Sequence, residues 1–249
     1  MDFKTTTGRI GVNITDKAAL TAQVQDRFAR REGFALATLN LDHLVKLGSQ
    51  STFATAYAKQ DLVTADGNPI VWISALAGRP VSLLPGADLV LPLASMAAQA
   101  GLKVALVGST QESLKGAEAA LVNAIPGVII AARIAPPMGF DPEGPEAEAI
   151  LKQLADLDIG LCFLALGAPK QEVLAALGRR IAPRTGFASI GAGLDFLSGH
   201  QNRAPRIVRR LALEWLWRAV HNPRRLALRY LQSAMILPGH ALRAIGSRL

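Results

Sequence analysis

IGLCFLALG, residues 159–167, is the stretch that decides the fold class. Its apolar side chains follow one another without the polar alternation of a half-exposed strand, and a glycine ends the run. A run of this kind is typical of a parallel strand that is buried on both faces. Helices have to cover both faces of such a sheet. The stretch therefore predicts an α/β fold.

Further apolar runs recur along the chain and are separated by helical patterns. The predicted strands are GFALATLN (33–40), DLVTAD (61–66), LKVALVG (102–108), VIIAARI (128–134), IGLCFLALG (159–167) and TGFASIGAG (185–193). The predicted helices lie near residues 41–59, 68–78, 87–100, 111–124, 145–156 and 170–181. This alternation predicts a Rossmann-like, mostly parallel sheet with helices on both faces. GRIGVNITD (8–16) has a hairpin-like pattern and is expected to add an edge strand.

The positive charge of the chain is concentrated near its C-terminus. The 249 residues carry a net charge of +8, and residues 200–249 hold ten arginines, no lysine and a single acid, Glu214. Two helices are predicted there, over 204–220 and 223–236, with leucines and tryptophans between the arginines. We therefore predict an α/β domain over 1–199 and a basic amphipathic helical appendage over 200–249.

Composition excludes several classes of protein. The start, MDFKTTTGRI, lacks the apolar h-region of a signal peptide. No apolar run approaches the ~20 residues that span a bilayer. The single cysteine, Cys162, lies in an apolar run and is expected to be a buried thiol. No Cys/His cluster with metal-ligand spacing is present, so we expect no metal and no cofactor.

Several predicted strands end in residues that suit a ligand site. Gly108, Gly167 and Gly191 stand at such ends, and Gln171 and Asp195 follow shortly behind the last two. Glycine lets a ligand approach the backbone, and free N–H groups at the start of a helix favour a phosphate. Glycines also end strands for purely steric reasons, and neither GxGxxG nor GxxxxGK[ST] is complete. A standard dinucleotide or P-loop site is therefore not supported.

Asp66 ends the predicted strand DLVTAD and is followed by Gly67 and a helical pattern. In open α/β sheets, ligands bind outside the carboxyl ends of the strands, where a carboxylate could act on a substrate. Alternatively, Asp66 caps the following helix or fixes a turn, as Asp-Gly often does. This stretch alone leaves both interpretations open.

A series of short motifs occurs in a fixed order along the chain. They are TLN (38–40), ADG (65–67), GADL (86–89), LGAPKQE (166–172), GAGLDFLSG (191–199), RAP (203–205), LEWLWR (213–218) and NPRRLALRYL (222–231). Together they resemble the WecG/TagA/CpsF family of bacterial glycosyltransferases, which includes the xanthan-type exopolysaccharide glucosyltransferase. The resemblance runs from about residue 8 to about residue 235.

The resemblance implies an inverting, metal-independent glycosyltransferase, either a hexosyltransferase or an N-acetylhexosaminyltransferase. Its expected donor is a UDP-sugar, and its expected acceptor is a polyprenyl-diphosphate-linked sugar in exopolysaccharide or cell-envelope polysaccharide biosynthesis. The protein is then expected to be cytoplasmic and peripherally associated with the anionic inner face of the cell membrane. The sequence names neither the donor sugar nor the acceptor, and it leaves a homo-oligomer open.

The same resemblance implies roles for individual residues. Asp66 matches the family's proposed general base, which would accept the proton of the attacking sugar hydroxyl. Thr38 and Asn40 match positions that line the same pocket, and Gln171 is expected to hold the donor phosphate or sugar. Asp195 is a candidate for the nucleotide end, although helix capping is the rival role for it and for Gln171. The expected donor-binding residues are Thr38, Asn40, Gly108, Gly167, Gln171, Gly191 and Asp195.

The chain departs from the family pattern just before the GADL motif. Many relatives carry an arginine roughly where Leu83 stands, and Arg79 is the nearest arginine in this sequence. The donor group that such an arginine would hold is therefore left to Arg79 or to an arginine of the tail. The candidate contacts to a diphosphate or a membrane are Arg79, Arg203, Arg206, Arg210, Arg218, Arg224 and Arg225.

Two other functions compete with sugar transfer. A nucleotide-sugar-binding sensor would bind UDP without turning over a sugar. A nucleic-acid-binding protein would use the arginine-rich tail, because arginines suit phosphate contacts. However, Trp215, Trp217 and several leucines are interleaved with these arginines on helical spacing. That pattern favours a membrane surface or a subunit contact, so no nucleic-acid partner is expected.

Overall fold

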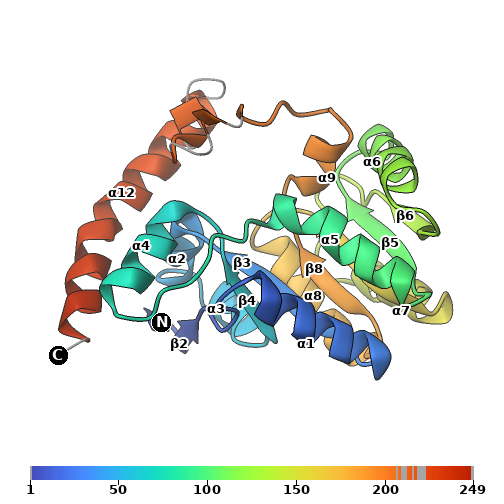
Figure 1. Ribbon diagram of the computed structural model, residues 1–249, viewed down its shortest axis with the longest axis horizontal. Helices are drawn as coiled ribbons and strands as arrows, with labels where there is room; N and C mark the ends of the chain where they lie inside the picture. The colour runs from blue at the N-terminus through green and yellow to red at the C-terminus, as the bar shows by residue number, and fades with distance from the viewer. Residues whose placement is uncertain (1, 206, 209–211, 215, 218–222, 248–249) are drawn as a thin grey trace.

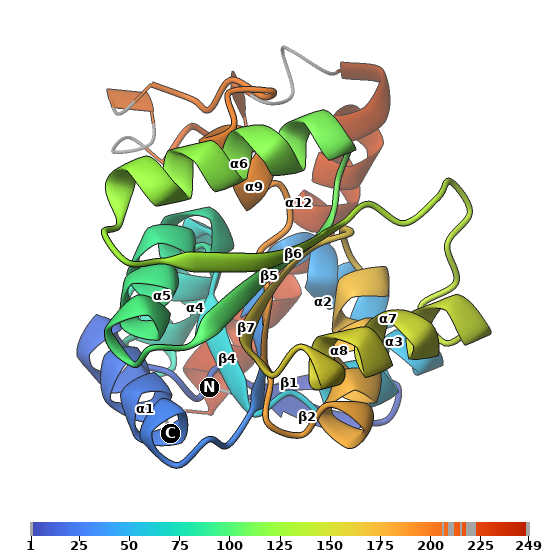
Figure 2. The ribbon, with the colours of Figure 1, turned by 90° about the vertical axis from the view of Figure 1, so that its right-hand side faces the viewer.

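A computed structural model describes the chain except for residues 1, 206, 209–211, 215, 218–222 and 248–249. At its centre is a six-stranded sheet of order β4-β3-β8-β7-β5-β6, in which all neighbours pair in parallel (Figures 1 and 2). The strands are β3 (Phe34–Leu39), β4 (Leu62–Ala65), β5 (Lys103–Gly108), β6 (Ile129–Ile134), β7 (Ile159–Ala165) and β8 (Gly186–Ser189). The predicted α/β class with a parallel sheet is therefore confirmed.

Strand β7 shows why the apolar runs are continuous. Successive side chains of a strand point to opposite faces of the sheet. Leu161 and Phe163 accordingly pack in the core on one face, whereas Cys162 and Leu164 pack in the core on the other. All four side chains are fully buried. Both faces of β7 are covered, so neither can accept a polar side chain without loss of stability.

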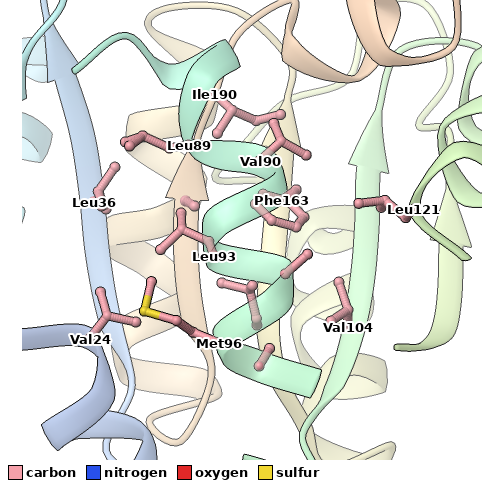
Figure 3. Close-up of a cluster of buried hydrophobic side chains, with 14 of the residues drawn as sticks. Val24, Leu36, Leu89, Val90, Leu93, Met96, Val104, Leu121, Phe163 and Ile190 are labelled. Atoms are coloured by element: carbon pink, nitrogen blue, oxygen red, sulfur yellow. The ribbon is translucent and has the colours of Figure 1, made fainter. Parts of the chain in front are cut away.

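Helices cover the two faces of the sheet (Figure 2). One face carries α1 (Lys17–Ala29), α5 (Gly86–Gln99), α6 (Gln111–Ala124) and the short α9 (Gly193–Leu197). The other face carries α3 (Ser51–Tyr57), α7 (Pro145–Asp156) and α8 (Lys170–Ile181). Figure 3 shows the first core, where Leu93 and Met96 of α5 lie against side chains that include Leu36, Phe163 and Val104.

The predicted helices 111–124, 145–156 and 170–181 have the bounds that the structure gives to α6, α7 and α8. The helical pattern predicted near 41–59 forms two helices, α2 (Leu41–Leu47) and α3, with Gly48 at the break. Gly48 is the C-cap of α2, and its N–H still makes the last helical bond, to the Leu44 carbonyl oxygen at 3.1 Å. The predicted helix 68–78 corresponds to α4 (Asn68–Leu76), and the strand predicted to reach 193 already ends at Ser189.

The N-terminal segment differs from its prediction. β1 (Asp2–Thr5) and β2 (Gly8–Gly11) form an antiparallel sheet of their own, so the expected edge strand of the main sheet is wrong. Asn13 follows this hairpin and binds the outer side of β4: its backbone N–H donates to the Val63 carbonyl oxygen, and its Oδ1 accepts from the Val63 N–H at 2.7 Å. The segment protects an exposed strand edge without becoming a strand.

The helix α1 was not predicted, although the sequence carries a signal for it. Its buried residues Leu20, Val24 and Phe28 recur every four residues, as on one face of a helix. Asp16 is its N-cap, and the side chain accepts from the Ala19 N–H at 2.8 Å. Both the apolar period and the capping acid can be found in the sequence.

The C-terminal helix α12 (Pro223–Gly246) lies along α2 and α4 (Figure 1). It confirms the helix predicted over 223–236 and continues it through Pro238. Ile236 and Leu237 pack against the core formed by the hairpin, α2 and α4, and the His240 ring meets Phe3 edge-on at 5.6 Å between centroids. The helix predicted over 204–220 lies partly outside the described residues. The division at residues 199 and 200 stays a prediction.

Candidate active site

The candidate site residues gather at the carboxyl edge of the sheet, the edge where every parallel strand ends. Thr38 lies at the end of β3, Asp66 follows β4, and Gly191 follows β8. Gly167 follows β7 and Gly108 ends β5. The order β4-β3-β8-β7-β5 makes these five strand ends consecutive neighbours. Residues more than a hundred positions apart in the sequence thus share one edge.

The connections leave this edge in different directions. The chain after β8 enters α9 on one face, whereas its neighbour β3 leads to α3 on the other, where Ala56 of α3 packs with Val173 and Ala176 of α8. Neighbouring strands whose connections diverge form a topological switch point, and ligands of doubly wound sheets bind there. Thr38, Asp66 and Gly191 lie at the switch point between β3 and β8, which makes this part of the carboxyl edge the candidate ligand site.

Asp66 is half-buried at this edge and has a defined position. Its backbone N–H donates to the Leu39 carbonyl oxygen at 2.7 Å, and its Oδ2 accepts from the Thr38 hydroxyl at 3.4 Å. The N-cap residue of α4 is Gly67, with φ of 108°, and it makes no side-chain cap. Asp66 is therefore not the N-cap of α4, which removes the helix-capping interpretation that the sequence left open.

Asn40 and Gln171 are engaged in contacts within the protein. Asn40 is the N-cap of α2, and its Oδ1 accepts from the His43 N–H at 2.9 Å. Gln171 is only 3% exposed; its Oε1 accepts from the Gly191 N–H at 3.2 Å, and its Nε2 donates to Glu172 at 2.8 Å. The structure thus brings two of the predicted donor-binding residues, Gln171 and Gly191, into contact at the turn after β8. A ligand contact from Gln171 stays a prediction.

Asp195 holds two segments together. Its Oδ1 accepts from the hydroxyls of Ser109 and Ser113, the latter at 2.7 Å, and its Oδ2 accepts from Gln201 Nε2 at 2.8 Å. Ser109 follows β5 and has φ of 53°, a left-handed conformation that is uncommon for a residue with a side chain. Asp195 therefore fixes the turn after β5, and its predicted contact with a nucleotide stays untested.

Glu172 is a site residue that sequence reasoning missed. It is fully buried, and burial raises its pKa from 4.5 to about 7, with Lys46 opposing part of that rise. Its Oε2 has no hydrogen-bond partner among the described residues. The pKa of Tyr57, also fully buried, is raised by burial first and then by the charges of Glu172 and Asp66. The available signal was an acid within α8, where residues 171–176 are buried without interruption.

The predicted arginines separate into distinct groups. Arg203 forms an ion pair with Asp88 of the GADL motif, stacks over the Phe196 ring at 5.8 Å and lies within electrostatic range of Asp66. Arg79 instead pairs with Asp2 at 3.9 Å, beside the N-terminal hairpin. Arg203 is thus the described arginine that the structure brings toward the site. Three predicted positions, Arg206, Arg210 and Arg218, lie outside the described residues, as do the side chains of Arg224 and Arg225.

The candidate site is distinct from a hollow in the protein surface and holds no group of metal ligands among the described residues. A hollow of about 470 Å³ lies between the C-terminal ends of α1 and α5, at the opposite, amino edge of the sheet, since these helices lead into β3 and β5. It contains none of the residues at the carboxyl edge. In the part of the chain that the structure describes, no three His, Cys, Asp or Glu side chains are grouped so that they could hold a metal ion.

The fold is that of a doubly wound α/β protein, with a positioned carboxylate and glycine turns at the candidate site on its carboxyl edge. Comparison with known families then identifies the chain: it belongs to the glycosyl transferase WecG/TagA/CpsF family, whose model matches residues 6–248. The resemblance inferred from the short motifs is confirmed. The protein is therefore a glycosyltransferase of polysaccharide biosynthesis.

The buried Glu172 should make the stability of the protein depend on pH. Because its pKa is raised in the folded state, the contribution of Glu172 to stability is fully present below about pH 4.5 and is lost as the pH rises through about 7. The loss amounts to roughly 3 kcal/mol. Glu172→Gln should remove it, so urea unfolding at several pH values should show a flatter pH dependence for the variant. The exposed Glu148→Gln is the control, and parallel curves for wild type and Glu172→Gln would contradict the assignment.

Proposed function

We propose that the protein transfers a sugar, with inversion, from a UDP-sugar to a polyprenyl-diphosphate-linked sugar. The single observation that carries the proposal is the position of Asp66, half-buried at the switch point with its carboxylate bonded to the Thr38 hydroxyl. The hydroxyl group of an acceptor sugar must lose a proton as it attacks. A carboxylate held at a strand end is suited to take that proton.

The proposed step balances as a single displacement. The acceptor oxygen forms a bond to the anomeric carbon of the donor sugar, and the bond from that carbon to the UDP oxygen breaks on the opposite face. The hydroxyl proton passes to the Asp66 carboxylate, and UDP leaves as a diphosphate anion. Thr38 orients the carboxylate for this transfer. The product is a lengthened lipid-linked saccharide.

The leaving diphosphate needs positive charge. Arg203 is the described arginine nearest to this role, although its guanidinium is now paired with Asp88. Guanidinium groups offer several N–H donors in a fixed fork and stay charged, which suits a diphosphate. We propose that Arg203 or the tail arginines at 206, 210, 218, 224 and 225 supply this contact. Arg79 is a weaker candidate because it lies beside Asp2.

Asp66→Asn should lower the transfer rate by ~10²-fold or more while UDP affinity stays within about twofold, because only the proton acceptor is lost. Transfer to a lipid-linked acceptor and calorimetric UDP binding should be measured on the same preparation. Asp156→Asn, which changes an exposed carboxylate on α7, is the matched control. Near-normal turnover of Asp66→Asn would show that Asp66 is only a turn residue.

Sugar transfer should persist in EDTA. The proposal uses arginines for the diphosphate. The Asp-x-Asp triplet of the chain, Asp156-Leu157-Asp158, lies where α7 leads into β7, at the amino edge of the sheet and away from Asp66. The measurement is the initial rate after dialysis against chelator, with and without added Mg²⁺ or Mn²⁺. A rate that disappears on chelation and returns with either ion would overturn the metal-independent mechanism.

The acceptor is lipid-linked, so we also propose that α12 docks the enzyme on the anionic inner face of the cell membrane. Its outward side exposes Leu231, Met235, Leu242 and Ile245, opposite the side that packs on the body. Among the described residues, no helix is long and apolar enough to cross a membrane. The arginines of residues 200–249 would supply electrostatic attraction, at about 1 kcal/mol for each one near the surface. The helix would therefore lie in the interface.

The double variant Met235→Gln/Leu242→Gln should weaken binding to anionic vesicles about tenfold or more, because exposed apolar burial is lost while the packed face stays intact. Co-sedimentation with phosphatidylglycerol vesicles at low and high salt measures this effect. Val122→Gln changes an exposed apolar side chain on α6, away from α12, and is the control. Wild-type pelleting by the double variant would contradict docking through this face.

A further inference from the structure

One side chain joins the start of α8 to the loop between β8 and α9. Gln171 accepts the Gly191 N–H on Oε1 at 3.2 Å and donates from Nε2 to Glu172 Oε1 at 2.8 Å. Gln171 is 3% exposed and Glu172 is fully buried, so water does not compete for either contact. The two residues therefore form a buried chain of hydrogen bonds that ends on the backbone of the β8–α9 loop.

The direction of this chain is fixed by its last member. A backbone N–H can only donate, so the carbonyl oxygen of the Gln171 side chain has to face Gly191. Its amino group then faces Glu172, whose Oε1 has to accept. A proton on Glu172 must consequently sit on Oε2, the buried oxygen that has no partner among the described residues. Glu172 thus acts on Gln171 as an acceptor in either protonation state.

We propose that Glu172 is a positioning residue. Through the Gln171 amide, it holds the β8–α9 loop at the carboxyl edge in the conformation that binds the donor. We call the hydrogen bonds between Glu172 and Gln171 and between Gln171 and Gly191 the clamp. An effect of the clamp on UDP-sugar binding rests on the proposed function, whereas the clamp itself does not. Without Glu172, the Gln171 amide could turn over and present its amino group to Gly191. Two donors would then face each other, and the loop would lose its anchor.

The clamp extends beyond Gly191. The loop has φ of 56° at Gly191 and leads into α9, whose Asp195 holds Ser109 and Ser113. In the turn after β7, just before α8, the Ala168 carbonyl oxygen accepts from the Lys46 ammonium group at 3.2 Å. The turns after β5, β7 and β8 are therefore connected to one another by side chains. Loss of the Glu172 acceptor should therefore disturb the turn after β8, which is connected to both of the others.

Amide hydrogen exchange of Gly191, measured by NMR on the full chain, tests the clamp directly. Exchange should accelerate about tenfold in Gln171→Met and in Glu172→Leu, because the acceptor of the Gly191 N–H is removed or misdirected. Glu172→Gln should keep the wild-type rate, since its amide oxygen can still accept from Gln171. Val173→Ala, a neighbouring buried change outside the chain of hydrogen bonds, is the control.

A wild-type exchange rate at Gly191 in Glu172→Leu would overturn the proposal. Should that variant not fold, the same rate in Gln171→Met would overturn it. Steady-state kinetics supply the second readout: the KM for the UDP-sugar should rise about tenfold in Glu172→Leu with kcat within about twofold, and Glu172→Gln should restore the KM. Faster exchange with an unchanged KM would show that the clamp is structural and not positioning. Failure of wild type to bind UDP would instead refute the proposed donor, and Gly191 exchange would still decide the clamp.

Discussion

A parallel sheet buried on both faces is the constraint on which the rest of this structure depends. Apart from the edge strand β6, its strands have almost no solvated side, so their sequences are largely apolar and most polar chemistry lies at the strand ends. Because all six strands run the same way, every carboxyl end lies at one edge. Asp66, Thr38 and Gly191 meet there although they belong to three separate segments. The position of the candidate site follows from strand direction and order.

The turns at that edge are held mainly by side chains from neighbouring connections. Gln171 reaches across to the loop after β8, Asp195 reaches to the turn after β5, and Lys46 reaches to the turn after β7. Each contact uses a buried or half-buried polar group, and such groups stabilise a structure only when they find a partner. An edge built in this way is largely formed before any ligand arrives. Such an edge suits the proposed transfer, in which two sugars and a diphosphate are oriented at once.

The C-terminal helix serves the body and leaves an opposite apolar face exposed. Its inner side joins the core that includes the N-terminal hairpin, α2 and α4, so it belongs to the packed structure and not to a free tail. Its outer side carries Leu231, Met235, Leu242 and Ile245 without a covering element among the described residues. The inner side of α12 packs on the hairpin, α2 and α4, so the body holds the helix in place. Its outer side is therefore held ready for the proposed membrane contact.

The sequence by itself determined the α/β class, most strand and helix positions, the family and the strand-end place of Asp66. These depend on patterns within a few neighbouring residues or on motifs in order. Tertiary structure alone decided the strand order, the burial of Glu172, the pairing of Arg79 with Asp2 and that of Arg203 with Asp88. It also placed the N-terminal hairpin outside the main sheet. Such contacts join segments far apart in the chain, and no local pattern of apolar or polar residues encodes which distant side chain fills a given space.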